Sequence, residues 1–193
     1  MYLTKANRIE RMGFVSTRLQ GIDGVSLEAA KWATVLERMG FGCYYFCGQS
    51  DRPADKTMVV EEAYFGHPDV SALQAKCFGR TSRDEWVTGE AHRLRQLLKK
   101  SLYSFIERFG IDLLIVENAL SIPMNIPLGL AITEVLAETG LPAIGHHHDF
   151  SWERKRFIMR GVDDYLDMAF PPRLHAMNHV VINTEARTQL GHR

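Results

Sequence analysis

The sequence contains little cysteine, has no excess of either charge and lacks any long apolar run. Its 193 residues include three cysteines, and the closest two, Cys43 and Cys47, are separated by three residues, which is not the spacing of a zinc-binding pair. An odd number of cysteines also argues against a disulfide framework. We therefore expect Cys43, Cys47 and Cys77 to be reduced, half-buried thiols.

The balance of charge and the lack of apolar runs exclude further classes of protein. The 23 basic residues are matched by 23 acidic ones, so no overall field attracts nucleic acid. No run of about 18 apolar residues occurs, and the positively charged first residues have no apolar stretch of signal-peptide length. These absences predict a cytoplasmic protein that does not bind nucleic acid. They leave membrane association open, although this sequence does not encode it.

Short β-branched apolar segments alternate with helical segments along the chain. Strands are predicted over residues 12–19, 43–47, 58–65, 112–118, 142–148 and 179–183. Helices are predicted over 25–39, 84–109 and 128–139, with short surface helices between 149 and 170 and a last helix from 185. This alternation predicts one α/β domain over 1–193, with a Rossmann-like, doubly wound and mostly parallel sheet. Ligands of such sheets bind at the carboxyl ends of the strands.

A glycine loop, Gly21-Ile22-Asp23-Gly24-Val25, follows the first predicted strand and precedes the first helix. Backbone N–H groups at a helix N-terminus can face an anion, and glycine lets a ligand approach closely. The spacing is neither the dinucleotide motif G-x-G-x-x-G nor the P-loop. A tight turn with Asp23 or Ser26 as the helix cap is the alternative interpretation.

Three histidines and an aspartate, His146-His147-His148-Asp149, end another predicted strand. His146 and His148 should face one side of the sheet and His147 the other. Two imidazoles on one side are capable of binding a metal, but the residues after Asp149 do not continue an H-x-H-x-D-H pattern. We therefore predict no metal and favour contact with a polar ligand, with packed structural histidines as the alternative.

Two further groups of polar residues lie at strand ends. Glu117 and Asn118 end the strand predicted to be most buried, where a carboxylate needs a ligand or a partner such as a helix end. The cationic residues in the run from Trp152 to Arg156 can meet a phosphate or form a solvated helix face.

Four segments at successive strand ends carry a resemblance to a known family: STRLQGIDGVS, ENALSIPMNIPLG, LPAIGHHHDFSWER and HVVINTEAR. In this order they resemble the N-terminal domain of family 4 glycosyltransferases of the GT-B fold, over nearly the whole chain. The resemblance implies transfer of a hexosyl group, with retention of configuration and without a metal. The donor would be a nucleotide-sugar such as a UDP- or GDP-sugar, and the acceptor a sugar, glycan or lipid-linked sugar.

The resemblance also implies roles for particular residues. The glycine loop from Gly21 to Val25 would approach the donor phosphates and the acceptor, and His148 would be the catalytic-site histidine that contacts the donor sugar. Candidates on the acceptor side are Asn118, Asp149, Phe150, Arg154 and Lys155.

Nothing in the sequence corresponds to the family's C-terminal domain, which carries the nucleotide pocket and an E-x7-E motif. We therefore expect a fragment or a subunit of a split enzyme that is inactive alone. Three alternatives stay open: a GT-B-like nucleotide-sugar epimerase, a non-catalytic α/β binding module, and a metal-dependent hydrolase built on His146, His148 and Asp149.

Overall fold

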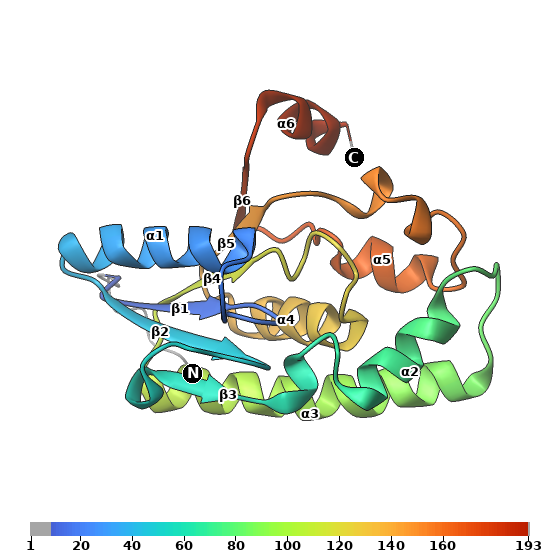
Figure 1. Cartoon of the computed structure of the whole chain (residues 1–193), viewed down its shortest axis with the longest axis horizontal. Helices are drawn as coiled ribbons and strands as arrows, with labels where there is room; N and C mark the ends of the chain where they lie inside the picture. Colours follow the sequence, from blue (N-terminus) through green and yellow to red (C-terminus); the bar gives the residue numbers. More distant parts are fainter. Residues whose placement is uncertain (1–8, 193) are drawn as a thin grey trace.

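A computed structural model describes residues 9–192 and contains one six-stranded parallel sheet (Figure 1). The strands lie in the order β3-β2-β1-β4-β5-β6, and each neighbouring pair is parallel. Their bounds are β1 Arg11–Val15, β2 Gly42–Cys47, β3 Thr57–Val59, β4 Leu113–Glu117, β5 Ala143–His147 and β6 Met177–Val181. This order confirms the predicted Rossmann-like α/β class.

Helices cover both faces of the sheet. They are α1 Gly24–Arg38, α2 Pro68–Cys77, α3 Glu85–Phe109, α4 Ile126–Thr139, α5 Asp163–Ala169 and α6 Thr184–Gly191. In Figure 1, α1 lies above the sheet and α3 below it. Ala29 and Ala33 of α1 pack in one core with β1, β2 and β4, whereas α3 and α4 share another core with the opposite sheet face. The sheet is therefore doubly wound, as expected.

Local signals fix the ends of α3, the longest helix. The Asp84 carboxylate accepts a hydrogen bond from the Val87 N–H at 3.0 Å, which caps the first turn. Gly110 ends the helix with a φ of 60°, in the left-handed region that glycine adopts readily. Burial of one side of α3 completes the predicted amphipathic helix.

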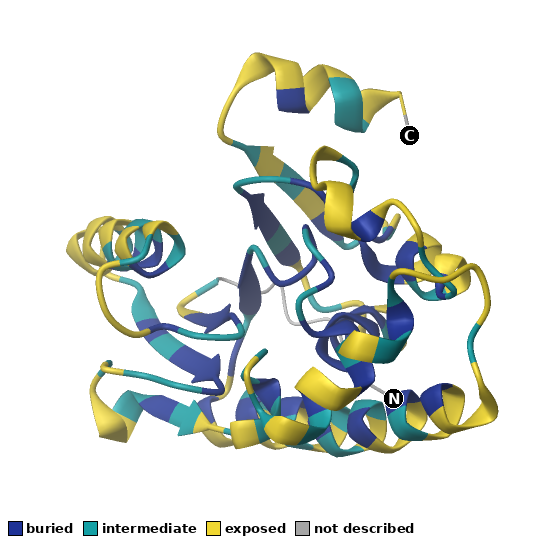
Figure 2. Cartoon of the chain, turned by 45° about the vertical axis from the view of Figure 1, so that its right-hand side comes forward, coloured by how far each residue is buried: buried dark blue, intermediate teal, exposed yellow. Residues whose placement is uncertain are grey.

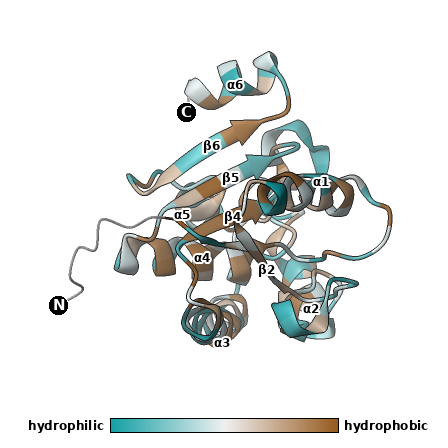
Figure 3. Cartoon of the chain, turned by 90° about the vertical axis from the view of Figure 1, so that its left-hand side faces the viewer, coloured by the Kyte–Doolittle hydropathy of each residue, from teal (hydrophilic) through white to brown (hydrophobic). Residues whose placement is uncertain are grey.

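The middle of the sheet is the most buried part of the molecule. All five residues of β4 are buried, and α4 is largely apolar and buries ten of its 14 residues (Figures 2 and 3). In contrast, α6 is mostly exposed at the edge next to β6 (Figure 2). Among the described residues, no helix combines the length and apolar character that membrane crossing requires.

Residues 48–79 differ from the prediction. The strand expected over 58–65 is only the three-residue β3, followed by a 3-10 turn over Glu61–Ala63. The prediction also missed α2, which begins at Pro68 and buries three apolar residues in a core shared with α3. Few apolar residues mark α2, so its helical period is weak and its packing decides the conformation.

Three smaller expectations need correction. The first strand ends at Val15 rather than Leu19, and Leu19 forms an isolated bridge with Ser50. The cysteines are free thiols but fully buried rather than half-buried. Burial raises the pKa of Cys43 and Cys47 to about 11 and that of Cys77 to about 12. The 3-10 turns over 151–157 also reach the core, where Phe157 is buried.

Candidate functional site

The carboxyl ends of β1, β4 and β5 lie side by side because these strands are neighbours in the sheet. The loop after β1 leads to the glycine loop and α1, β4 ends at Glu117, and β5 ends at His147. The fold therefore brings three of the predicted polar groups to one edge, which is the edge where parallel α/β sheets bind ligands.

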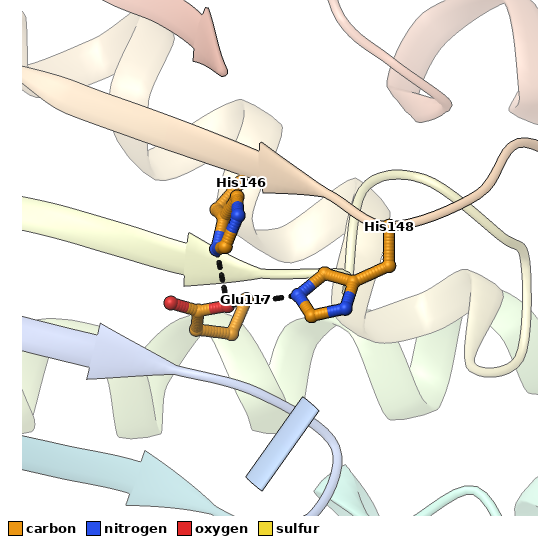
Figure 4. A group of neighbouring side chains, drawn as sticks. All are labelled: Glu117, His146 and His148. Atoms are coloured by element: carbon orange, nitrogen blue, oxygen red, sulfur yellow. Dashed lines mark hydrogen bonds and ion pairs between the residues drawn. The ribbon is translucent and has the colours of Figure 1, made fainter. Parts of the chain in front are cut away.

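Glu117 is the centre of a buried polar cluster with His146 and His148 (Figure 4). Its side chain is fully buried, and Oε2 accepts a hydrogen bond from His146 Nδ1 at 2.9 Å. The Nε2 atom of His148 lies 3.6 Å from the same oxygen. Two imidazoles, and not a helix end, are thus the partners of this carboxylate, and His146 and His148 do face the same side.

Two atoms of the cluster have no hydrogen-bond partner in the described part of the chain. They are Glu117 Oε1 and His148 Nε2, and both are buried. Buried polar atoms are rarely left without partners in native proteins, so such atoms indicate contact with water or a ligand. The Trp32 ring of α1 stacks on His146 with a centroid distance of 4.6 Å and closes this end of the cluster.

The cluster also has a donor set that suits a metal ion. One ligand atom each from Glu117, His146 and His148 lies within 4.8 Å of the others. Imidazole and carboxylate together are common ligands of zinc and of other transition metals. The hydrogen bond between His146 and Glu117 is the competing use of the same atoms.

Asn118 joins the ends of β4 and β5. Its φ of 56° is in the left-handed region, which asparagine tolerates better than most residues. Its Oδ1 accepts from the His148 N–H, and its Nδ2 donates to Asp149 Oδ1, both at 3.1 Å. These two hydrogen bonds hold the backbone of residues 148 and 149 against the end of β4.

The glycine loop is a turn with a helix cap. Asp23 accepts from the Ser26 N–H at 3.2 Å, so the capping interpretation is confirmed for Asp23. Arg18 also donates to Asp23, at 3.1 Å. Burial acts to raise the pKa of Asp23, but the hydrogen bonds from Ser26 and the charge of Arg18 outweigh it and lower the pKa. Gly21 has a φ of 81°, and its N–H donates to Asp51 at 2.8 Å.

A cavity of about 150 Å³ opens between this loop and the end of β4. Its lining comprises Ser16, Thr17, Arg18, Asp23, Val25, Phe65, Glu117, Asn118, Ile122, Met124 and Arg156. Of the predicted site residues, Asp23, Val25 and Asn118 lie in this wall.

The other predicted residues lie elsewhere. Phe150 is fully buried and stacks on Trp152, and Arg154 pairs with Asp149. Lys155 and Ile22 are exposed outside the cavity wall. Gly21 and Gly24 flank the capped turn without lining the cavity.

The prediction of individual site residues missed Arg18 and Arg156. The run from Trp152 to Arg156 did signal a cationic group, but only the tertiary structure shows which cation of the run reaches the cavity. Arg18 has no distinctive local signal, because it becomes a wall residue only through its pairing with Asp23.

His147 points to the opposite side of the sheet, as its alternation in the strand predicts. It is buried, contacts Ser121 Oγ through Nδ1, and lies 2.8 Å from His179 Nδ1 through Nε2. Burial, with the nearby histidines, lowers the pKa of His147 to about 3. Its role is therefore to join β5 to β6 as a neutral ring.

Comparison with known proteins adds a relationship to this geometry. No protein-family model matches the chain. The chain is 31% identical over 184 residues to mannosylglucosylglycerate synthase of Petrotoga mobilis, and 33% identical over 181 residues to the synthase of the same name from Thermotoga maritima. These alignments cover 93% and 89% of the chain. The chain is homologous to part of these synthases. It spans about two fifths of their length, 41% and 40% respectively.

Proposed function

We propose that this chain is the N-terminal, acceptor-side domain of a retaining family 4 glycosyltransferase of the GT-B fold. The observation that carries the proposal is the polar cluster of Glu117, His146 and His148 beside a capped glycine loop, at the ligand-binding edge of a parallel sheet. The relationship to the two synthases supports the reaction class. More than half of each relative lies outside the alignment, which leaves room in those proteins for a second domain.

The names of the relatives supply candidate substrates. We propose that the donor is a nucleotide-activated mannose, with UDP or GDP as the leaving group, and that the acceptor is a glucosylglycerate. A complementary C-terminal domain would bind the nucleotide, so the chain alone would lack transfer activity. We propose no catalytic metal, because the hydrogen bond between His146 and Glu117 gives the cluster a role without one.

The geometry around His148 supports a proposed role for this residue. Glu117 Oε2 lies 3.6 Å from His148 Nε2. Asn118 holds the His148 backbone through its side-chain oxygen. The ring is then oriented to contact a hydroxyl of the donor sugar and to fix the anomeric carbon near the acceptor. A leaving diphosphate would be stabilised by positioned donors rather than by a protein nucleophile.

The test is product formation by the protein at the full length that its gene encodes. It is incubated with UDP- and GDP-mannose and a glucosylglycerate acceptor, and mass spectrometry detects the mannosylated glucosylglycerate. His148→Ala should lower kcat/KM by about tenfold or more, the effect of one polar contact worth roughly 1–3 kcal/mol. His175→Ala, at an exposed histidine before β6, is the matched control. Unchanged kinetics in the His148 variant would refute the assignment.

A further inference from the structure

One of the charged side chains that line the cavity has no ion-pair partner among the described residues. Four charged side chains line it: Arg18, Asp23, Glu117 and Arg156. Arg18 pairs with Asp23 at 3.1 Å, and Glu117 pairs with His146. Within the described residues, no carboxylate lies within ion-pair distance of Arg156. Arg156 is therefore the cation of the cavity wall that makes no direct ion pair within residues 9–192.

Arg156 is held in place by neutral contacts. Its Nη2 donates to the Met124 sulfur at 2.8 Å, and its guanidinium carbon lies 4.6 Å from the centroid of the Phe157 ring. Phe157 is buried and packs edge-on against Phe78. Arginine has five N–H donors in a planar fork, so these contacts leave donors free at the cavity. The fork matches a carboxylate, with which it forms two parallel hydrogen bonds.

The rest of the wall suits a polyhydroxylated ligand. Ser16, Thr17 and Asn118 contribute polar side chains, and Phe65, Ile122 and Met124 contribute apolar ones. Arg156 also lines a neighbouring cavity of about 320 Å³ with Phe65 and Met124, so its guanidinium stands where two hollows meet. A ligand with sugar hydroxyls at one end and an anionic group at the other fits this distribution of polarity.

We infer that Arg156 binds the carboxylate of an acidic sugar acceptor and thereby selects it over neutral sugars. The acceptor role rests on the proposed function, and the glycerate in the names of the relatives is a carboxylate of this kind. Arg156 is a specificity residue in this scheme, because it touches the substrate away from the reacting hydroxyl. The carboxylate is distinguished from a donor diphosphate by the measurements below.

Binding is measured by calorimetry on the full-length protein with four probes: glucosylglycerate, its neutral analogue glucosylglycerol, UDP and GDP. Wild type should bind the acid about tenfold or more tightly than the alcohol, as one charge-assisted contact allows. Arg156→Gln should remove that preference and leave the Kd for the alcohol within about twofold of the wild-type value. Arg156→Lys keeps the charge without the planar fork, so its preference for the acid should lie between those of wild type and Arg156→Gln. The control is Arg80→Gln, at an exposed arginine outside the cavity.

Four results would overturn the inference: no preference of wild type for the acid, unchanged binding of the acid by Arg156→Gln, an equal loss for acid and alcohol, or a loss confined to the diphosphates. Thermal unfolding of each variant separates a loss of fold from a loss of contact. Sugar transfer is assayed on the same samples. Selective binding of the acid without product refutes the proposed transferase but keeps the carboxylate site, whereas product formation that is indifferent to Arg156 refutes the site alone.

Discussion

The neutral state of His147 makes the stability of this protein depend on pH. His147 is buried between Ser121 and His179, and burial first, then the neighbouring histidines, lowers its pKa from 6.5 to about 3. The unfolded chain therefore takes up a proton below pH 6.5, whereas the folded chain does so only near pH 3. The contribution of His147 to the free energy of unfolding is fully present above about pH 6.5. It decreases as the pH falls below that value and stops decreasing near pH 3.

The magnitude follows from the two pKa values. At about pH 4.5, two units below the unfolded pKa, protonation of the unfolded state costs roughly 2.7 kcal/mol of folding free energy. The folded state is almost unprotonated at that pH, so a folded pKa one unit higher changes the result little. The free energy of unfolding contributed by His147 should thus fall by about 2.6 kcal/mol between about pH 7.5 and about pH 4.5.

Urea unfolding of wild type and His147→Gln at several pH values measures this term. The His147→Gln variant should be less stable at neutral pH because it loses buried contacts. Between about pH 7.5 and about pH 4.5, its free energy of unfolding should fall by about 2.6 kcal/mol less than that of wild type. His147→Asn, a second uncharged replacement, should give the same slope and guards against a variant that fails to fold. His179→Gln measures its neighbour, whose pKa burial also lowers. Equal slopes for wild type and both His147 variants would refute the reasoning.

Three further predictions concern the cluster, the turn after β2 and the metal. Glu117→Gln should lower the free energy of unfolding by roughly 1–3 kcal/mol, since it weakens a buried charge-assisted bond; a variant as stable as wild type in urea contradicts this. Gly48→Ala should lower the free energy of unfolding by about 3 kcal/mol, because the new Cβ would lie 2.0 Å from the Tyr64 nitrogen. Gly89→Ala meets open space on α3 and should raise the free energy of unfolding by about 0.5–1 kcal/mol. Equal effects of the two substitutions in urea unfolding would contradict the packing around Gly48. Chelator treatment should leave the proposed sugar transfer unchanged. Elemental analysis that finds stoichiometric zinc in wild type and none in Glu117→Gln would show a metal site instead.

Local signals in the sequence were enough for the long helices and the central strands. The start of α3 at Asp84 and its end at Gly110 depend on hydrogen bonds and backbone angles within a few residues, and the spacing of its apolar residues is a property of one helix. The alternation of strands and helices then limited the topology to a doubly wound sheet. It also predicted which histidines share a face, because side chains alternate along any strand.

The same signals could not supply α2 or the contacts of the site. The conformation of α2 depends on burial against α3, and the partner of Glu117 depends on the pairing of β4 with β5, in which Glu117 stands opposite His146. In the sequence, Arg156 cannot be distinguished from its neighbours in a cationic run, because only the 3-10 turns after β5 place it at the cavity.

The sequence by itself thus determined the class of fold and the edge that carries the polar residues, and it narrowed the cap of α1 to Asp23 or Ser26. Only the tertiary structure decided which of those residues touch, because contacts between strand ends are made by segments about 30 residues apart or more, whose distance no local pattern encodes. The burial that lowers the pKa of His147 and the position of Arg156 at the cavity are likewise properties of the packed chain.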